Sequence, residues 1–141
     1  MGLLYYPSAG EVLMCHYDEK ALDPEMCKAR PAIVIGPRLR NRARLVTVVP
    51  LSTTEPNTLL DYHCRVEIAP LLPEPFDAAV MWAKCDMVSS VSLDRLDRFK
   101  EPYQRGSARK WRTGRVNAVQ IAALRASVLC GLGLSHLTQH L

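Results

Sequence analysis

The sequence predicts a mainly β fold, a small twisted barrel or half-barrel of five strands that is followed by one C-terminal helix. Three observations lead to this prediction. Short apolar runs, rich in β-branched residues and mostly too short for helices, recur along the first two thirds of the chain. Prolines and glycines separate these runs, as they do in small all-β domains. A helical apolar period occurs near the C-terminus, at residues 117–132.

Length and composition fit one folded domain. A chain of 141 residues is long enough to bury a hydrophobic core. We expect one domain over residues 1–141, with the barrel at about 8–99, a basic loop at about 100–114 and the helix at about 117–132. Since the sequence contains no run of 18 apolar residues and no convincing signal peptide, we expect a cytoplasmic protein without a membrane span.

The first three predicted strands lie between clear turn signals. Gly10–Tyr17 is the first, and the polar segment Asp18–Lys28 after it is a loop. Pro31–Ile35 and Leu45–Leu51 follow, and the turn dipeptide Gly36-Pro37 lies between them. Both runs are short, apolar and rich in β-branched residues, which is typical of buried strands.

Two further strands are predicted in the second half of the chain. Tyr62–Ile68 alternates between apolar and polar residues, as a half-buried antiparallel strand does. Ala78–Val88 is a longer apolar run that is interrupted by Lys84 and Asp86. In a strand, positions 84 and 86 share a face, so we expect an ammonium group and a carboxylate to lie side by side there.

The remaining segments lead to the terminal helix. Ser92 is a plausible N-cap for a short helical turn at Leu93–Asp97, and Phe99–Gly114 looks irregular. Asn117 and Gln120 have the spacing of a capping box. The apolar stripe of the helix comprises Ile121, Leu124, Val128 and Leu132. Such a stripe predicts a core contact or a dimer interface.

The net charge is only +4, but the basic and acidic residues are unevenly distributed along the chain. Lys28–Arg44 holds six basic residues and no acid, and Arg98–Arg115 holds seven basic residues and one acid, Glu101. These segments together carry +12, which leaves −8 for the rest of the chain. Concentrated basic segments suggest a polyanion as partner, with an attraction that weakens as salt rises. The alternative is a solvated basic surface.

Aromatic residues interleave with the second basic segment. Phe99, Tyr103 and Trp111 alternate there with arginine and lysine, a combination that suits base stacking together with contact to a nucleic-acid backbone. The alternative is that Trp111 anchors the segment on the barrel.

The cysteines and histidines do not form a recognisable metal motif. The chain has five scattered cysteines and no C-x-x-C pair, which favours reduced thiols. The spacing of Cys15, His16, His63, Cys64 and Cys85 fits no common zinc motif. We therefore expect no metal site and no cofactor.

Four sequence blocks resemble, in order and spacing, the conserved blocks of PemK/MazF-like toxins. They are GEVLMCHY, KARPAIVIGP, VTVVPLSTTEPN and VMWAKCDMVSSVSLDRL, which together span roughly Gly10–Phe99. The Arg-Pro entry to the second strand and the Pro-x-[Ser/Thr]-Thr exit from the third carry most of the resemblance.

The resemblance implies an SH3-like barrel of about five to seven strands, of the CcdB/PemK-like kind, with a terminal helix and a homodimeric assembly. It also implies an endoribonuclease that cleaves single-stranded RNA without a metal ion. The usual partner is an antitoxin whose C-terminal peptide covers the RNA groove.

The resemblance also assigns roles by position. Arg30 matches the catalytic arginine of the family, Ser52 and Thr53 match its hydroxyl pair, and Asp86 matches an acidic residue that some members use as general base. Lys84 stands where those members carry an arginine, and the loop before Arg30 contains no histidine. The residues expected to contact RNA are Lys28, Arg38, Arg40, Arg42, Arg44, Arg109, Lys110 and Trp111.

Two readings of these residues remain open. In RNA cleavage by the 2′-hydroxyl, Arg30 stabilises charge on the phosphorane, and Asp86 acts as base or holds Arg30 in place. Alternatively, Arg30 and Asp86 form an ordinary ion pair at the barrel rim. At the level of function, the alternative is a catalytically weak or inactive module that binds RNA or inhibits a protein, as CcdB-like gyrase poisons do.

Overall fold

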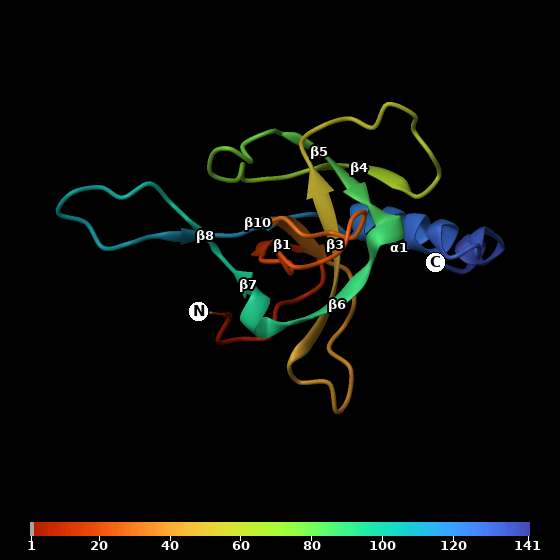
Figure 1. Ribbon diagram of the computed structural model, residues 1–141, viewed down its shortest axis with the longest axis horizontal. Coiled ribbons are helices and arrows are strands. Elements are labelled where there is room, and N and C mark those ends of the chain that lie inside the picture. Colours follow the sequence, from red (N-terminus) through yellow and green to blue (C-terminus); the bar gives the residue numbers. More distant parts are fainter. Residues whose placement is uncertain (1) are drawn as a thin grey trace.

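The computed structural model describes residues 2–141 and shows an antiparallel β fold that is flanked by one helix (Figure 1). The strands are β1 Glu11–Cys15, β2 Arg30–Val34, β3 Leu45–Ser52, β4 His63–Glu67, β5 Val80–Lys84, β6 Ser89–Ser92, β7 Leu96–Asp97, β8 Phe99–Lys100, β9 Trp111–Arg112 and β10 Gly114–Arg115. The helix is α1 Ala118–Gly131, and the 3₁₀ turns are η1 Cys85–Met87, η2 Leu93–Arg95 and η3 Ser135–His140. The predicted mainly β fold with a C-terminal helix is confirmed.

The main sheet has eight strands and follows the order β10-β1-β2-β3-β5-β4. β6 adds to β3 and β7 adds to β1. Only η2 separates β6 from β7 along the chain. The segment β6–η2–β7 therefore runs from β3 to β1 and completes the barrel. The strands thus curl into a small barrel that closes through a 3₁₀ turn instead of a continuous ladder.

Two hydrophobic clusters fill the two faces of the sheet. The first, the barrel core, comprises Leu3, Leu13, Cys15, Ala32, Val34, Val46, Val48, Val91, Leu93 and Leu96. The second, the helix-side core, includes Ile33, Val49, Leu51, Val66, Met81, Ala83, Cys85 and Leu124. Successive residues of β2 and β3 alternate between the two cores. Both of their faces are therefore buried, which explains why these strands are continuous apolar runs.

α1 begins at the predicted capping box, which is confirmed. The Asn117 side chain accepts a hydrogen bond from the Gln120 backbone N–H at 2.9 Å, and the Gln120 side chain accepts one from the Asn117 N–H at 3.3 Å. In the predicted stripe, Leu124 is fully buried, and Ile121 and Val128 pack against the helix-side core. Leu132 lies beyond the helix and is 60% exposed, so the stripe is wrong at that position.

Two segments differ from the predictions. The strand predicted over Ala78–Val88 ends at Lys84, and Asp86 lies in η1, so the two residues do not share a strand face. The Cys85 N–H still donates to the Tyr62 carbonyl at 3.0 Å, in register with the β4–β5 ladder, and the chain then turns into η1, where the Asp86 backbone lies against Gly131 of α1.

The segment 99–114 is not wholly irregular, because its ends form a hairpin arm of β8 and β9 that projects from the barrel (Figure 1). Glu101 and Arg112 form an ion pair of 2.7 Å at its base, and Phe99 is buried in the helix-side core. Ser92 caps the turn at Leu93 as predicted, with its Oγ accepting from the Asp94 N–H at 3.1 Å.

Candidate active site

Arg30 and Ser52 lie toward the same end of two neighbouring strands. Arg30 is the first residue of β2 and Ser52 is the last residue of β3. The two strands are antiparallel and their ladder ends with Ala32 opposite Pro50, two residues before each of them. Beyond that pair, Arg30 lies opposite Cys15 of β1, and Ser52 lies opposite Trp82 of β5. The guanidinium and hydroxyl ends that the sequence singled out therefore lie at the same end of the β2–β3 ladder.

Ser52 also lines a cleft at the end of β5. The cleft has a volume of about 280 Å³ and is lined by Ser52, Thr54, Glu55, Pro56, Asn57, His63 and Lys84. Lys84 lies opposite His63 in the β4–β5 ladder, and Trp82 lies opposite Ser52 in the β3–β5 ladder. Lys84 is thereby placed beside the hydroxyl end of β3, as the resemblance implies. Thr53 is exposed on the adjoining turn.

The Ser52 hydroxyl is oriented by its own turn. Its Oγ accepts a hydrogen bond from the Thr54 backbone N–H at 3.1 Å. An accepted bond leaves the O–H of a serine free to donate. Ser52 can therefore present a donor to a phosphate oxygen in the cleft.

His63 is a cleft residue that the sequence did not reveal. Its Nδ1 accepts a hydrogen bond from the Leu60 backbone N–H at 3.0 Å. This assigns the proton of the neutral ring to Nε2, which leaves an N–H donor for a ligand. The alternating pattern of Tyr62–Ile68 indicated only an outward-facing residue. Its place beside Lys84 follows from the pairing of β4 with β5, which no local pattern encodes.

Tyr17 and Ser89 are two further residues that sequence reasoning missed. Tyr17 lies near both Ser89 and Arg30, and burial is the main reason why the pKa of the Tyr17 phenol is raised above its usual range. Cys15 adds to this increase, whereas Ser89 and Arg30 act against it. A phenol beside a guanidinium group and a hydroxyl group can hold one of them by hydrogen bonding.

Asp86 is not in contact with Arg30. Asp86 is exposed on η1, and among residues 2–141 no ion pair or hydrogen bond joins the two side chains. The interpretation of Arg30 and Asp86 as a barrel-rim ion pair is therefore wrong. The physical reason is the end of β5 at Lys84, after which the 3₁₀ turn carries Asp86 out of the strand.

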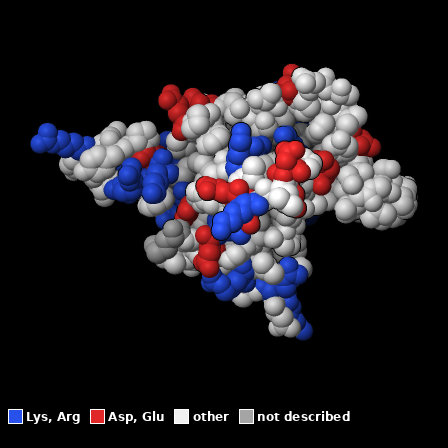
Figure 2. Space-filling view, viewed as in Figure 1, with Lys and Arg blue, Asp and Glu red and all other residues white. Residues whose placement is uncertain are grey.

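The arginine-rich turn lies at the far end of β3 from Ser52. Arg38, Arg40, Arg42 and Arg44 are exposed in the β2–β3 loop, and Arg44 pairs with Asp94 at 2.6 Å. An eight-residue strand separates this loop from Ser52, a distance of about 23 Å. Figure 2 shows blue side chains on this lower loop and on the hairpin arm, with red side chains nearer the centre. Lys28, by contrast, is exposed just before Arg30.

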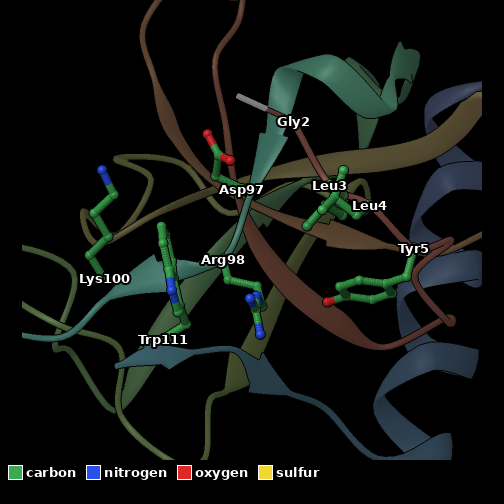
Figure 3. Close-up of a pocket in the computed structure, with 8 residues that line it drawn as sticks. All are labelled: Gly2, Leu3, Leu4, Tyr5, Asp97, Arg98, Lys100 and Trp111. Atoms are coloured by element: carbon green, nitrogen blue, oxygen red, sulfur yellow. The ribbon is translucent and has the colours of Figure 1, made fainter. Parts of the chain in front are cut away.

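Trp111 lies between two cations on the hairpin arm. The Cζ atom of Arg98 is 5.4 Å and the Nζ atom of Lys100 is 5.5 Å from the centroid of its ring. Figure 3 shows the indole standing between these two side chains in a pocket of about 340 Å³ that residues 2–5 also line. Trp111 is 40% exposed, so part of the ring is open to a ligand. Further along the arm, Arg109 lies over the Tyr103 ring at 5.7 Å.

Two features are absent from residues 2–141: a cluster of metal-ligating side chains and a helix able to span a membrane. Across residues 2–141, histidine, cysteine and acidic side chains nowhere gather in a group of three that could hold a metal ion. Within the same range, every helix is too short or too polar to cross a membrane.

Comparison with known proteins relates this fold and this site to one family. The model of the PemK-like, MazF-like toxin of type II toxin–antitoxin systems matches residues 8–127. YifN of Escherichia coli K12 is 33% identical over 116 residues, which cover 70% of this chain and 76% of YifN.

Two solved structures share the fold. An endoribonuclease from a mycobacterial species superposes with a TM-score of 0.55 at 16% identity and covers 94% of this chain and 97% of its own. The Mycobacterium tuberculosis toxin MazF-mt6 gives 0.52 at 18% identity and covers 86% and 96%. Since the family match spans most of the sequence, the chain belongs to the PemK-like, MazF-like toxins of type II toxin–antitoxin systems.

Proposed function

We propose that this protein is an endoribonuclease toxin that cleaves single-stranded RNA without a metal ion. The observation that carries the proposal is the cleft at the end of β3, where Ser52, Lys84 and His63 lie together, with Arg30 toward the same end of the antiparallel neighbour β2. A guanidinium, an ammonium and a hydroxyl group at one sheet edge are suited to a phosphodiester. Membership of the toxin family and the fold shared with an endoribonuclease support this assignment.

The proposed reaction needs no group from outside the chain and the RNA except solvent water. The 2′-oxygen attacks the adjacent phosphorus, the bond from phosphorus to the 5′-oxygen breaks, and the products are a 2′,3′-cyclic phosphate and a 5′-hydroxyl. A base takes the proton of the 2′-hydroxyl, and solvent water supplies the proton that the 5′-oxygen gains, so that the protons balance overall. Arg30 and Lys84 offset the charge on the phosphorane, and Ser52 and Thr53 donate to its oxygens. Asp86 is the proposed base, because it is exposed two residues after Lys84.

The proposed RNA path extends beyond the cleft. Lys28 lies two residues before Arg30, and Trp111, Arg109 and Lys110 lie on the projecting arm. Arg38, Arg40, Arg42 and Arg44 are about 23 Å from Ser52, so we assign them to contacts with flanking RNA and to long-range attraction. Both groups act on the phosphate backbone, and binding should weaken as salt rises.

Two protein partners are proposed as well. The first is a second copy of this chain, because α1 and the residues after it expose apolar side chains, among them Val119 at 78% and Leu132 at 60%. The second is an antitoxin that covers the RNA site, as family membership indicates. Light scattering of a micromolar solution tests the dimer, and a mass near 15.8 kDa would count against it.

A non-catalytic binder is the second candidate. The observation in its favour is the lack of contact between Arg30 and Asp86, which leaves the proposed base apart from the charge stabiliser. Such a module would bind RNA or a protein target and cut nothing.

One assay distinguishes the two candidates. The wild-type protein, Arg30→Ala and the control Arg65→Ala are incubated with long single-stranded RNA in EDTA. Arg65 is exposed on β4 and pairs with Glu67, so its loss should leave cleavage unchanged. We expect the wild type and the control to cut, and Arg30→Ala to be slower by about 10²- to 10³-fold.

Cleavage, metal independence and the role of the 2′-hydroxyl are each contradicted by a different outcome. Binding without cutting by the wild type, over a range of RNA sequences, would favour the binder. Cutting that requires a divalent ion would overturn the mechanism. A substrate with a 2′-deoxy sugar at the cut site should resist, and its cleavage would exclude the 2′-hydroxyl as nucleophile.

A further inference from the structure

Three buried polar side-chain atoms of residues 2–141 have no hydrogen-bond partner: Tyr17 Oη, Arg30 Nε and Ser89 Oγ. Buried polar atoms in native proteins are nearly always paired, because an unpaired one loses its hydration without compensation. Unpaired atoms are therefore informative where they cluster. Here one of the three belongs to the arginine that we assign to catalysis.

The fold gathers these three atoms at one mouth of the barrel. Arg30 lies opposite Cys15 in the β1–β2 ladder, and Tyr17 follows Cys15 by two residues, the strand interval at which side chains return to one face. Ser89 begins β6 on the neighbouring side of β3. Tyr17 packs against the barrel core, and both Arg30 and Ser89 are close enough to influence its ionisation.

The chemistry of the three atoms is complementary. Arg30 Nε–H can only donate, whereas each hydroxyl can both donate and accept. Ser89 and Cys15 lie near the phenol, but neither forms a hydrogen bond of acceptable geometry with it in this structure. The Tyr17 hydroxyl can therefore accept from Arg30 Nε–H and at the same time form a hydrogen bond with Ser89.

We propose that Tyr17 and Ser89 are positioning residues: when a phosphate is bound, the Tyr17 hydroxyl accepts the one hydrogen bond of Arg30 Nε–H, and the Ser89 hydroxyl holds the Tyr17 hydroxyl in place. The terminal nitrogens of Arg30 support this arrangement. They make no hydrogen bond or ion pair within residues 2–141, and they are not among the buried unpaired atoms, so they are open to solvent. The inner nitrogen thus lies buried at the barrel mouth, and the outer pair is free to contact a phosphate.

This inference rests on the proposed function and adds a cause for the orientation of Arg30. A guanidinium group that is free to rotate loses part of its contact with the phosphorane, because catalysis depends on groups that are fixed before the reaction. Catalytic hydrogen bonds are often long in the absence of substrate and tighten in the complex. The pairing is therefore expected to form fully with the substrate.

The kinetic test uses Tyr17→Phe and Ser89→Ala, each with a matched control. Tyr6→Phe removes a phenol that donates to the Leu45 carbonyl at 2.8 Å, at the other end of β3. Ser90→Ala removes the neighbouring, exposed hydroxyl of β6. We expect each test variant to lower kcat by about tenfold with KM within about twofold, as for the loss of a hydrogen bond to a charged group. Ser89→Thr, which keeps the hydroxyl, should retain activity.

A second measurement is independent of cleavage. The Nε–H signal of Arg30 is identified by its loss in Arg30→Lys, and its hydrogen exchange is followed by NMR with a 2′-deoxy oligonucleotide bound. We expect exchange to be at least about tenfold faster in the Tyr17→Phe, Ser89→Ala double variant than in the wild type.

The outcomes separate the inference from the proposed function. Unchanged kcat in both single variants, or unchanged Nε–H exchange in the double variant, would overturn the positioning role. If the wild type cuts no RNA, the proposed nuclease fails, and the NMR result alone decides whether Tyr17 and Ser89 hold Arg30. A folded variant is confirmed by its unfolding transition, which should stay cooperative.

Discussion

Gly131 of α1 lies directly against Asp86 of η1. A Cβ atom added to Gly131 would be 3.1 Å from the Asp86 Cα and 3.4 Å from its backbone nitrogen. The C-terminal end of the helix therefore rests on the segment that follows Lys84 and carries the proposed base. Because backbone atoms cannot swing aside as side chains do, this contact couples the position of the helix to that of the site.

Gly131→Ala should disturb the site more than the fold. Alanine favours a helix over glycine by about 0.5–1 kcal/mol, which offsets part of the cost of the close contact. The backbone of η1 must nevertheless shift by a few tenths of an ångström. We expect RNA cleavage to fall by about tenfold, with a change of less than about 1 kcal/mol in the free energy of unfolding. Cleavage rates and urea titrations measure the two effects.

Ala122→Gly is the control for the effect of helix propensity on the free energy of unfolding. Ala122 is exposed on α1, so its change should cost about 1 kcal/mol of stability and leave cleavage alone. Full activity of Gly131→Ala would show that the site does not depend on the contact between helix and turn.

The partners of Arg30 differ in how far they could be predicted from the sequence. Arg30 and Ser52 lie on strands that one loop joins, and such strands pair as a hairpin, so their position toward one end of the ladder could be predicted from the order of the runs. His63 and Lys84 also lie on consecutive strands, but the register of β4 and β5 is set across the long connection of residues 68–79, and Tyr17 beside Ser89 depends on the placement of β1 relative to β6. Local periodicity does not encode that placement.

The position of Asp86 shows a second limit of prediction from the sequence, the end of a strand. The run Ala78–Val88 has no glycine or proline to mark the end of β5, so its pattern predicts a strand through residue 86. The strand ends at Lys84, and the chain turns into η1 where the Asp86 backbone packs against Gly131 of α1. Here a tertiary contact overrides a local pattern.

Trp111 should contribute to RNA binding through stacking. Arg98 and Lys100 lie on its ring, and a stacked base is worth about 1–3 kcal/mol in alanine substitutions. We expect Trp111→Ala to weaken the binding of a 2′-deoxy oligonucleotide by about tenfold in fluorescence anisotropy, and Trp111→Phe to retain most of the affinity. Lower stability of Trp111→Ala with unchanged affinity would instead support the role of Trp111 as an anchor of the arm.

Asn117→Ala should destabilise the protein through the first turn of α1. The substitution removes the acceptor for the Gln120 N–H, and the loss of such a cap costs about 1 kcal/mol. Gln120→Ala removes the reciprocal bond of 3.3 Å and should cost less. Urea unfolding measures both changes. Equal stability of Asn117→Ala and the wild type would show that packing of Leu124, and not the cap, holds the helix in place.

Buried thiols should make the protein less stable at alkaline pH. Burial raises the pKa of Cys15 from 9.0 to about 11. Between these values the unfolded chain loses this proton and the native chain keeps it, so the unfolded state binds fewer protons. The free energy of unfolding therefore falls as pH rises from about 9 to 11, and the contribution of Cys15 is fully present below pH 9. For one thiol the fall is about 2 kcal/mol.

Cys15→Ala should flatten the pH dependence of stability in this window. Its stability at pH 8 falls because the barrel core loses the sulfur atom, at a cost of about 1 kcal/mol. The further loss from pH 9 to 11 should be smaller than in the wild type by about 2 kcal/mol, as measured by urea unfolding in a reducing buffer. Cys27→Ala, in the β1–β2 loop, is the matched control and should follow the wild-type profile. Parallel profiles for Cys15→Ala and the wild type would show that ionisation of the buried thiol does not limit alkaline stability.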